Sequence, residues 1–121
     1  MALYEESSDN DGSMNNYSIT DDMAYYPAWQ WAVNYSDAAT NLTSDYRTGW
    51  YFPAKNEVTT LMNNKTVVSA ALQAAGGTSI DGNYWTSSLG SDGTPFSYFS
   101  GSMGTLAGFT SGFNVRAVRK F

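Results

Sequence analysis

The stretch that decides the fold is GWYFPAKNEV, residues 49–58. A glycine followed by three aromatic residues predicts a short buried strand, and Pro53 ends it because proline cannot donate to a sheet ladder. A helix is expected next, over residues 54–63. Its buried face is expected to consist of Val58, Leu61 and Met62. Glu57 stands where the acid of a capping box belongs, so its carboxylate can accept a hydrogen bond from the Ala54 N–H.

A helix is also expected before this stretch, from near Asp22 or Pro27 to about Asp37, because proline suits the first turn of a helix. An apolar stripe with spacing i, i+3, i+4 and i+7 predicts a face toward the core. The stripe consists of Ala28, Trp31, Ala32 and Tyr35. The alternative for Trp29 and Trp31 is a pair that stacks on a sugar ring, and the stripe favours the core.

A further helix is expected over residues 67–75, with Thr66 as its N-cap and the glycines of residues 76–77 as its end. Its alanine-rich sequence suggests close packing. From residue 84 onward, strands are expected to alternate with glycine-rich turns. The chain is expected to close on a strand over residues 114–121.

The first 22 residues are polar, and DNDGS at residues 9–13 predicts an Asx turn. The alternative is a calcium loop in which Asp9 and Asp11 would be ligands. Ser18 then stands where the bidentate glutamate of an EF-hand belongs, and no helix pattern precedes the segment. The plain turn is therefore favoured, and no metal site is expected.

Charge is unevenly distributed along this acidic chain, whose formal net charge is −5. The acidic residues at the start are Glu5, Glu6, Asp9, Asp11, Asp21 and Asp22, and the basic residues at the end are Arg116, Arg119 and Lys120. If both ends lie close in the fold, these groups would attract each other; the alternative is solvated surface charge. The net charge argues against a nucleic-acid partner.

The composition removes most catalytic chemistry, because the 121 residues include no histidine and no cysteine. A serine–lysine pair is what remains, and neither Lys55 nor Lys65 has a serine motif nearby. Catalysis by paired carboxylates in a cleft stays an alternative, although acidic residues are sparse beyond the N-terminal region. We expect no enzyme and no cofactor. No signal peptide and no membrane span are expected, and a cell-surface or virion location stays open.

Residues 86–114, TSSLGSDGTPFSYFSGSMGTLAGFTSGFN, have the composition of an antibody paratope. Serine, glycine and threonine supply more than half of them, Asp92 is the one formal charge, and five aromatic residues are interspersed. The segment has neither the low hydrophobicity nor the high charge that is typical of disordered segments. The segment is therefore predicted to be a displayed binding surface between the more rigid sequences that flank it.

Several motifs resemble those of one family. GWYFPAKNEV is similar to the family motif G-W-Y-L-P-S-x-x-E-L, and NYWTSS (residues 83–88) is similar to its Y-W-S-S-S. FSG (residues 99–101) resembles an F-x-x-G or F-x-G element of the family, and VRAVRKF (residues 115–121) resembles its V-R-A-V-R-x-F. The resemblance covers residues 11–121. It is to the C-type-lectin-like domains of bacteria, archaea and phages, near the C-terminal domain of the Legionella collagen-like adhesin. This group includes the variable proteins of diversity-generating retroelements.

The resemblance implies an α+β protein with a C-type lectin fold: two to three helices packed on a small mixed, mainly antiparallel sheet, with the termini close together. It also implies a ligand surface built from the C-terminal half of a single domain, residues 1–121. Calcium-dependent sugar binding does not carry over, because the E-P-N, Q-P-D and W-N-D motifs of animal lectins are absent. Ala54 departs from the family's serine or threonine, which affects helix capping.

Composition offers a check on diversification, since randomised NNC and NNT codons cannot encode Lys, Glu, Gln, Trp or Met. In residues 86–114 the first four are missing and methionine occurs once, at Met103, whereas residues 1–85 hold fifteen of the five types. At that rate about five would be expected in the segment. A plain loop region rich in serine and glycine would show part of this depletion.

These observations predict a calcium-independent, receptor-binding or adhesin-like protein with a diversified surface, whose partner is an unknown macromolecule, most simply a protein. The alternative is a fixed-specificity adhesin or structural module. The expected ligand-binding residues are Leu89, Asp92, Phe96, Tyr98, Leu106, Phe109, Thr110 and Phe113. The expected scaffold residues are Trp85, Phe99, Gly101, Val115, Arg116, Val118 and Arg119. For Phe96, Phe109 and Phe113 core packing stays open, and for Phe99 it is favoured.

Overall fold

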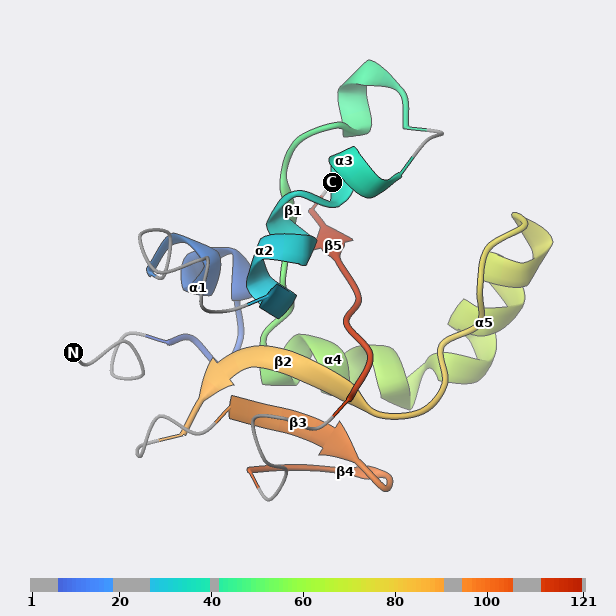
Figure 1. Cartoon of the computed structure of the whole chain (residues 1–121). Helices are drawn as coiled ribbons and strands as arrows, with labels where there is room; N and C mark the ends of the chain where they lie inside the picture. The colour runs from blue at the N-terminus through green and yellow to red at the C-terminus, as the bar shows by residue number, and fades with distance from the viewer. Residues whose placement is uncertain (1–6, 19–26, 40–41, 91–94, 106–111, 121) are drawn as a thin grey trace.

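The computed structural model describes residues 7–18, 27–39, 42–90, 95–105 and 112–120. Its helices are α1 (Gly12–Ser18), α2 (Pro27–Val33), α3 (Tyr35–Ala38), the 3-10 helix η3 (Ser44–Tyr46), α4 (Lys55–Asn63) and α5 (Lys65–Ala74). Its strands are β1 (Trp50–Tyr51), β2 (Tyr84–Leu89), β3 (Pro95–Phe99), β4 (Ser102–Gly104) and β5 (Val118–Arg119) (Figure 1). Helices together with small antiparallel sheets make this an α+β protein.

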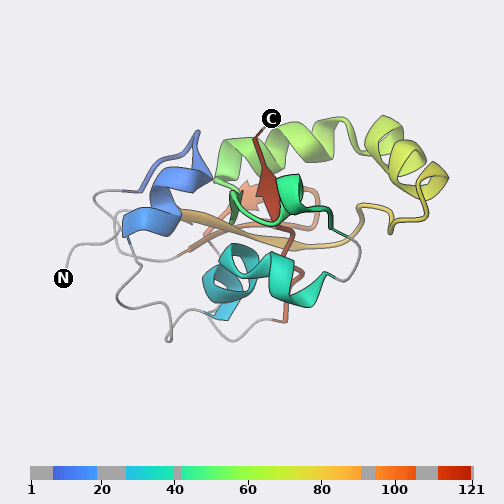
Figure 2. The same ribbon diagram turned by 90° about the horizontal axis from the view of Figure 1, so that it is seen from above.

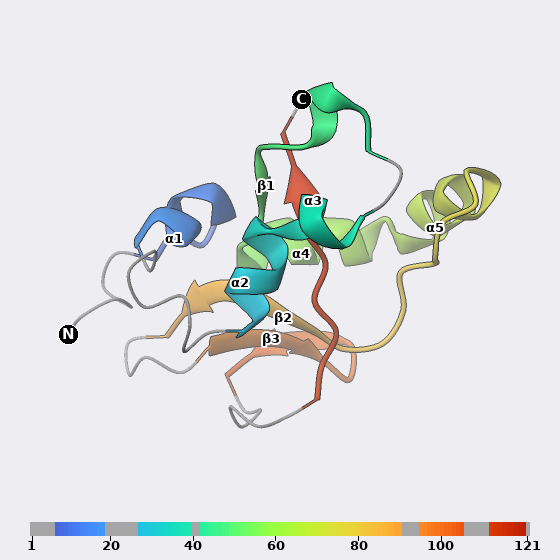
Figure 3. The ribbon, with the colours of Figure 1, turned by 45° about the horizontal axis from the view of Figure 1, so that its top comes forward.

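Two sheets organise the chain. β2, β3 and β4 form a three-stranded antiparallel sheet in that order, and β1 pairs with β5 in a separate antiparallel ribbon. β1 and β5 lie side by side close to α3, away from β3 (Figure 3). Ser100 and Gly101 connect β3 to β4 with φ values of 51° and 85°, the left-handed backbone of a type I′ hairpin turn. Because the strand order is β2-β3-β4, β4 lies at an edge of this sheet.

Helices cover both faces of the larger sheet. Figure 2 shows α4 and α5 on one side of it and α2 and α3 on the other. The α4 side holds a core cluster formed by Val58, Met62, Ile80 and Tyr84. The α2 side holds a cluster formed by Trp29, Ala32 and Phe52, against which Trp85, Leu89, Val115 and Ala117 pack. The sheet is thus the middle layer between two apolar cores.

The structure confirms the prediction for residues 49–58. β1 ends before the fully buried Phe52, and α4 follows Ala54 as its N-cap. Glu57 Oε1 accepts a hydrogen bond from the Ala54 N–H at 2.9 Å, as expected from the capping-box pattern. Val58 and Met62 are buried, and Leu61 packs against their cluster.

Helix α1 was not predicted from the sequence, because its residues GSMNNYS show no apolar period. It is held by polar groups and by close approach instead. A side chain at Gly12 would lie 2.0 Å from the Phe52 carbonyl oxygen, so only glycine fits. The Asx turn expected before the helix is present, with the Ser13 N–H donating to Asp11 Oδ1 at 3.1 Å.

The helix expected up to residue 37 is divided at Asn34 into α2 and α3. Trp29 and Ala32 of α2 are buried, whereas Trp31 is 41% exposed. The predicted core position of Trp31 is therefore wrong. A sugar-stacking pair of Trp29 and Trp31 is also excluded, since the Trp29 ring packs edge-on against Phe52 at 4.7 Å.

Two further boundaries differ from the prediction. α5 begins at Lys65, with Asn64 rather than Thr66 before its first turn, and it contains no buried residue. Its alanines are exposed and only Val68 and Leu72 pack against the core, so the expected close packing is absent. The closing strand is shorter than expected, because only Val118–Arg119 pairs with β1. Within the described ranges, no helix has both the length and the apolarity to span a bilayer.

An ion pair joins the N-terminal segment to the end of the described chain, since Lys120 Nζ lies 2.7 Å from Asp11 Oδ2. The attraction between the acidic start and the basic end is thus confirmed for this pair. The other terminal basic residues contact backbone instead: Arg119 donates to the carbonyls of Asp45 and Thr48, each at 2.7 Å. These bonds attach the η3 loop to β5.

The Asp11–Lys120 pair gives the protein an acid-sensitive contact. Hydrogen bonds from Lys120 and Ser13 lower the pKa of Asp11 below its ordinary value of 3.8. A carboxyl group with a lowered pKa stabilises the fold above its unfolded pKa, and this stabilisation is lost as the pH falls through the folded value. We expect D11N to unfold at a lower temperature than the wild type at pH 7, with the difference shrinking below pH of about 3. Thermal unfolding followed by circular dichroism checks this prediction. An equal difference in unfolding temperature at pH 7 and below pH of about 3 would contradict it.

Candidate ligand-binding surface

An aromatic stack lies on the α2 side of the three-stranded sheet, at the hairpin end of β3. It consists of Trp85, Phe113 and Phe99. The rings of Trp85 and Phe113 are 4.9 Å apart between centroids, and those of Phe113 and Phe99 are 5.4 Å apart and close to parallel. Phe99 is 45% exposed, the outermost member of the stack. The stack therefore joins the core under Trp85 to the solvent.

Strand alternation explains why these rings share a face. Trp85 is opposite Ser97 in the β2–β3 ladder, and Phe99 is two residues further along β3. Phe113 comes from the C-terminal segment, which is fixed to the sheet by backbone bonds through Asn114. The Asn114 N–H donates to the Asn83 carbonyl at 2.9 Å, and the Asn114 carbonyl accepts from the Trp85 N–H at 3.0 Å.

The hairpin that carries Phe99 is also anchored. The Ser100 N–H donates to Asn83 Oδ1 at 3.2 Å, which attaches the β3–β4 turn to the start of β2. Asn83 thus holds both the turn and, through its carbonyl, the segment that carries Phe113. The backbone that carries Phe99 and Phe113 is thus held by hydrogen bonds that do not involve the two rings, so these side chains can change without loss of the frame.

The opposite face of the sheet has a different character. Tyr98 packs against the Val58–Met62 cluster of α4, and Phe96, two residues earlier, lies under the ammonium group of Lys55. Lys55 Nζ is 3.9 Å from the Phe96 ring centroid and 3.3 Å from Asp9 Oδ2. This cation–π contact and ion pair hold the N-terminal segment over the sheet.

The described ligand-binding candidates do not form one surface. Phe113 belongs to the aromatic stack, whereas Phe96 and Tyr98 face α4, and Leu89 packs against the Trp29–Phe52 cluster. Whether any of them binds a ligand stays a prediction. The remaining candidates lie outside the described residues: Asp92, Leu106, Phe109 and Thr110.

Sequence reasoning misplaced Phe99, which was expected in the core. The strand alternation of PFSYF contained the signal: residues 96 and 98 share one face, and residue 99 falls on the other. Its position at the end of β3 then leaves it without a covering helix. The scaffold role expected for Arg119 and Val115 agrees with the structure, because Arg119 bonds the η3 loop and Val115 packs against a core cluster.

The start of the segment predicted to be displayed is buried. Thr86, Ser87, Ser88 and Ser97 are each at most 1% exposed. Their hydroxyl groups are used inside the protein: Thr86 Oγ1 donates to the Phe96 carbonyl at 3.0 Å, and Ser88 Oγ donates to the Ser8 carbonyl at 2.9 Å. These side chains are not accessible to a macromolecular ligand, so the displayed part of the segment begins further along.

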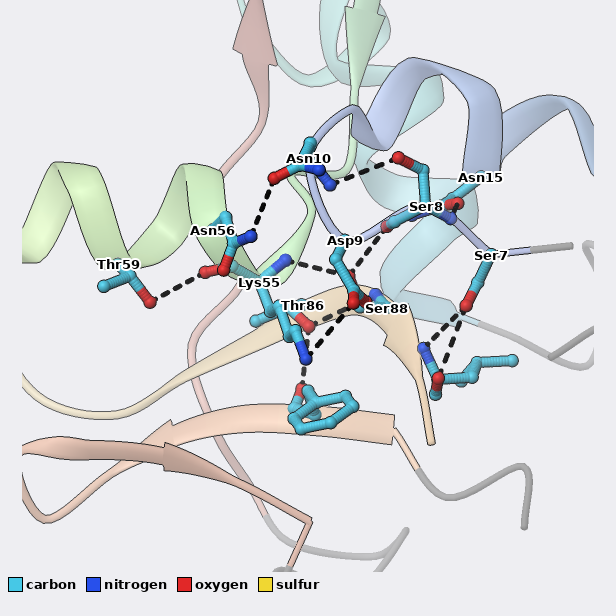
Figure 4. A network of polar contacts seen from close by, with 12 residues as sticks. Ser7, Ser8, Asp9, Asn10, Asn15, Lys55, Asn56, Thr59, Thr86 and Ser88 are labelled. Atoms are coloured by element: carbon cyan, nitrogen blue, oxygen red, sulfur yellow. Dashed lines mark hydrogen bonds and ion pairs between the residues drawn. The ribbon is translucent and has the colours of Figure 1, made fainter. Parts of the chain in front are cut away.

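The buried hydroxyls belong to a polar network that fastens the N-terminal segment to β2 and α4 (Figure 4). Ser88 Oγ also accepts from the Lys55 N–H at 2.9 Å, at the first turn of α4. Asn15 Nδ2 donates to Ser87 Oγ and to the Ser8 carbonyl, each at 2.8 Å. The network compensates for the buried polar groups of β2 and fixes the strand that carries Trp85.

In comparisons with known proteins, no family model, no curated protein and no solved structure matches this chain. In the part of the chain that the structure describes, no three acidic side chains converge as ligands for a metal ion. The site is therefore characterised by its own geometry, which is an aromatic stack surrounded by serine, glycine and asparagine.

Proposed function

We propose that this protein is a ligand-binding module, and that its binding surface is centred on the stack of Trp85, Phe113 and Phe99. The observation that carries this proposal is the 45% exposure of Phe99 on top of stacked rings. Exposed aromatic rings held in place are common anchors of binding energy in protein interfaces. The ligand would be a macromolecule, most simply a protein, bound without calcium.

The polar surroundings support an adaptable interface. Ser100, Gly101 and Ser102 form the exposed turn beside Phe99, and Gly112 and Asn114 flank Phe113. Small polar residues around fixed aromatic rings are the composition of paratopes, in which the rings supply contact area and the hydroxyls supply hydrogen bonds. Because the stack is already ordered, binding avoids most of the entropy cost of fixing these side chains.

We further propose a C-type-lectin-like scaffold whose surface is diversified by a retroelement. Supporting features are the small sheet between helices, the contact between Asp11 and Lys120 near the two ends, and the depletion of five residue types in residues 86–114. The DNA next to the gene tests the proposed diversification. A reverse-transcriptase gene with a near-copy of the 3′ coding end is expected, and its absence together with scattered differences among sibling sequences would favour the fixed-specificity adhesin.

Burial makes the diversification proposal more specific. Thr86, Ser87, Ser88 and Ser97 hold the frame, so we expect sibling sequences to keep them and to differ at exposed positions such as Phe99 and Ser102. Variation at Ser87 or Ser88 equal to that at Phe99 would contradict this expectation, because their hydroxyls bond Asn15 and Ser8.

The stack should tolerate substitution, as a variable surface must. We expect F99S to change the free energy of unfolding by no more than about 1 kcal/mol, since a half-exposed ring loses little burial. The matched control is Y98S on the same strand, which removes a ring from the α4 cluster and should cost about 2 kcal/mol. Urea unfolding measures both; a larger loss for F99S than for Y98S would show that Phe99 is structural.

A further inference from the structure

Three aspartates of this chain are followed directly by glycine, at residues 11–12, 81–82 and 92–93. In such a pair the glycine amide nitrogen can attack the carboxyl carbon of the aspartate side chain, because glycine has no side chain that obstructs a close approach. The structure describes the first two pairs and places them in opposite surroundings. They therefore compare the same dipeptide in two environments of one fold.

The pair Asp81–Gly82 lies in the connection between α5 and β2. Both residues are exposed, and the Asp81 side chain is 85% exposed. The Gly82 N–H donates to Asp81 Oδ1 at 2.9 Å, so the nitrogen and the carboxyl group that it would attack are already in contact. Gly82 has a φ of 86°, a turn backbone that glycine adopts without strain.

The contacts that hold this turn are weak. Lys65 Nζ lies 3.6 Å from Asp81 Oδ1, and both side chains are half exposed or more, so this ion pair contributes little. The Asp81 N–H donates to the Tyr84 hydroxyl and the Asp81 carbonyl accepts from Asn114 Nδ2, each over a long distance of 3.4 Å. The backbone of the turn can therefore rotate toward the geometry of attack.

The pair Asp11–Gly12 is held in the opposite way. Gly12 is buried at the first position of α1, close against the Phe52 carbonyl, and its N–H donates to Glu57 Oε1 at 2.7 Å. The Asp11 carboxylate is bonded to Lys120 at 2.7 Å. Attack by the Gly12 nitrogen would require α1 to leave its position and the charge-assisted hydrogen bond to Glu57 to break. The fold thus keeps this nitrogen from the carboxyl group beside it.

We propose that Asp81–Gly82 is a site of spontaneous covalent modification, at which the aspartyl bond converts to an isoaspartyl bond, and that the fold protects Asp11–Gly12. The Gly82 nitrogen bonds to Asp81 Cγ, and the hydroxyl of the protonated carboxyl group leaves with the amide proton as water. This step closes a succinimide ring. Water then opens the ring at the main-chain carbonyl, which frees an α-carboxylate and leaves Gly82 joined through Cβ and Cγ. One water is released and one is consumed, so the conversion needs no other reactant.

The modification would act on the aromatic stack through Asn83. An isoaspartyl bond adds one carbon atom to the backbone directly before Gly82 and Asn83. Asn83 Oδ1 accepts from the Ser100 N–H, and the Asn83 carbonyl accepts from the Asn114 N–H. A longer turn displaces Asn83 from both donors, so we expect the rings of the stack to lose their fixed positions. This consequence does not depend on whether the stack binds a ligand.

Ageing of the whole chain at physiological temperature and near-neutral pH tests the site. Endoproteinase Asp-N cleaves before aspartate but not before isoaspartate, so a digest read by mass spectrometry with electron-transfer fragmentation measures conversion at each position. We expect Asp81 to convert about tenfold faster than Asp11 in the folded protein, because reaction at Asp11 waits for local unfolding. In concentrated urea the two rates should agree within about twofold, since the fold no longer separates the two pairs. Asp92, outside the described residues, is measured separately by the same digest.

D81E is the matched control, because glutamate keeps the charge beside Lys65 but would have to close a larger ring, which is far slower. It should abolish conversion at position 81 and leave conversion at Asp11 unchanged. The isoaspartyl form of the wild type, separated by ion exchange, should give a weaker near-ultraviolet circular dichroism spectrum than the unmodified fraction of the same sample.

Three results would overturn the proposal. The first is conversion at Asp81 that is absent, or no faster than at Asp11, in the folded protein. The second is a preference for Asp81 that persists unchanged in urea, because the cause would then be the neighbouring sequence and not the fold. The third is an isoaspartyl form whose near-ultraviolet spectrum equals that of the unmodified fraction, which would refute the effect on the stack.

Discussion

Replacing Phe52 by alanine lowers the free energy of unfolding by about 4 kcal/mol, the largest single-residue effect we expect. Phe52 is fully buried, and its ring packs edge-on against Trp29 at 4.7 Å. It fills the α2-side cluster on which Trp85, Leu89 and Val115 rest. Alanine would leave a cavity among these residues, because the surrounding backbone is held by two sheets and cannot fully collapse. Urea unfolding followed by tryptophan fluorescence measures the loss.

F52L is the matched control. Leucine conserves most of the volume and keeps the position apolar, so F52L should cost about 1 kcal/mol. Leucine is also the residue that the G-W-Y-L-P pattern carries at this position. Equal losses for F52L and F52A would mean that the cost comes from the missing aromatic contact with Trp29 rather than from a cavity. A loss below about 1 kcal/mol for F52A would refute the central packing role of Phe52.

The same cluster shows what the sequence could predict. GWYFP and the helix after it were readable because a buried strand, a proline stop and a capping acid are local signals. The helix periodicity before it correctly indicated a helix, yet it placed Trp31 in the core together with Trp29, and only Trp29 is buried. Asn34 interrupts the helix and divides it into α2 and α3, and the apolar spacing across this position shows no break.

The N-terminal segment could not be predicted for a related reason. α1 docks through Gly12, which allows backbone to approach the Phe52 carbonyl, and through Asn15, which reaches Ser87. Both contacts join residues more than 35 positions apart, and neither residue type signals its partner. The polar residues of segment 86–114 suggested display by composition alone, whereas Ser87 and Ser88 are polar because they bond this buried segment.

The exposed aromatic rings, too, could be predicted only in part. Composition found an aromatic surface near the C-terminal half, and the structure supports Phe113 as part of one. It assigned Tyr98 to the binding surface and Phe99 to the core, whereas Tyr98 packs against the α4 cluster and Phe99 is exposed. Neighbouring residues of a strand point to opposite faces, and the packing of α4 decides which face is covered. Assignment of a binding residue in a short strand therefore depends on one register position.

Glu57 carries the second large effect, because its carboxylate joins three separate elements. Oε1 accepts from the Gly12 N–H of α1 at 2.7 Å and from the Ala54 N–H at 2.9 Å, and Oε2 accepts from the Tyr51 hydroxyl of β1 at 2.7 Å. Hydrogen bonds to a charged acceptor are worth more than neutral ones, and removing the acceptor leaves the donors unpaired. We expect E57A to lower the free energy of unfolding by about 3 kcal/mol.

Matched variants separate the bonds from the bulk of the side chain. E57Q keeps an oxygen for the Gly12 and Ala54 N–H groups and should cost about 1 kcal/mol. T60A, at an exposed position of the same helix, should stay within about 0.5 kcal/mol of the wild type. Y51F removes one donor, so its cost and that of E57A should be less than additive in the double variant. Strict additivity would show that Tyr51 and Glu57 do not interact.

The pH dependence gives Glu57 an independent readout. Burial, and then the hydrogen bond to Glu57, raise the pKa of Tyr51 above its ordinary value of 10.0. A phenol with a raised pKa stabilises the fold fully below its unfolded pKa, and this contribution is lost as the pH rises through the interval between the two values. Wild-type stability should therefore fall above pH of about 10, and Y51F should lose less over the same range. Tyr51 of β1, which is buried and bonded to Glu57 of the following helix, would then account for the alkaline limit of the fold; identical alkaline profiles for the two proteins would rule this out.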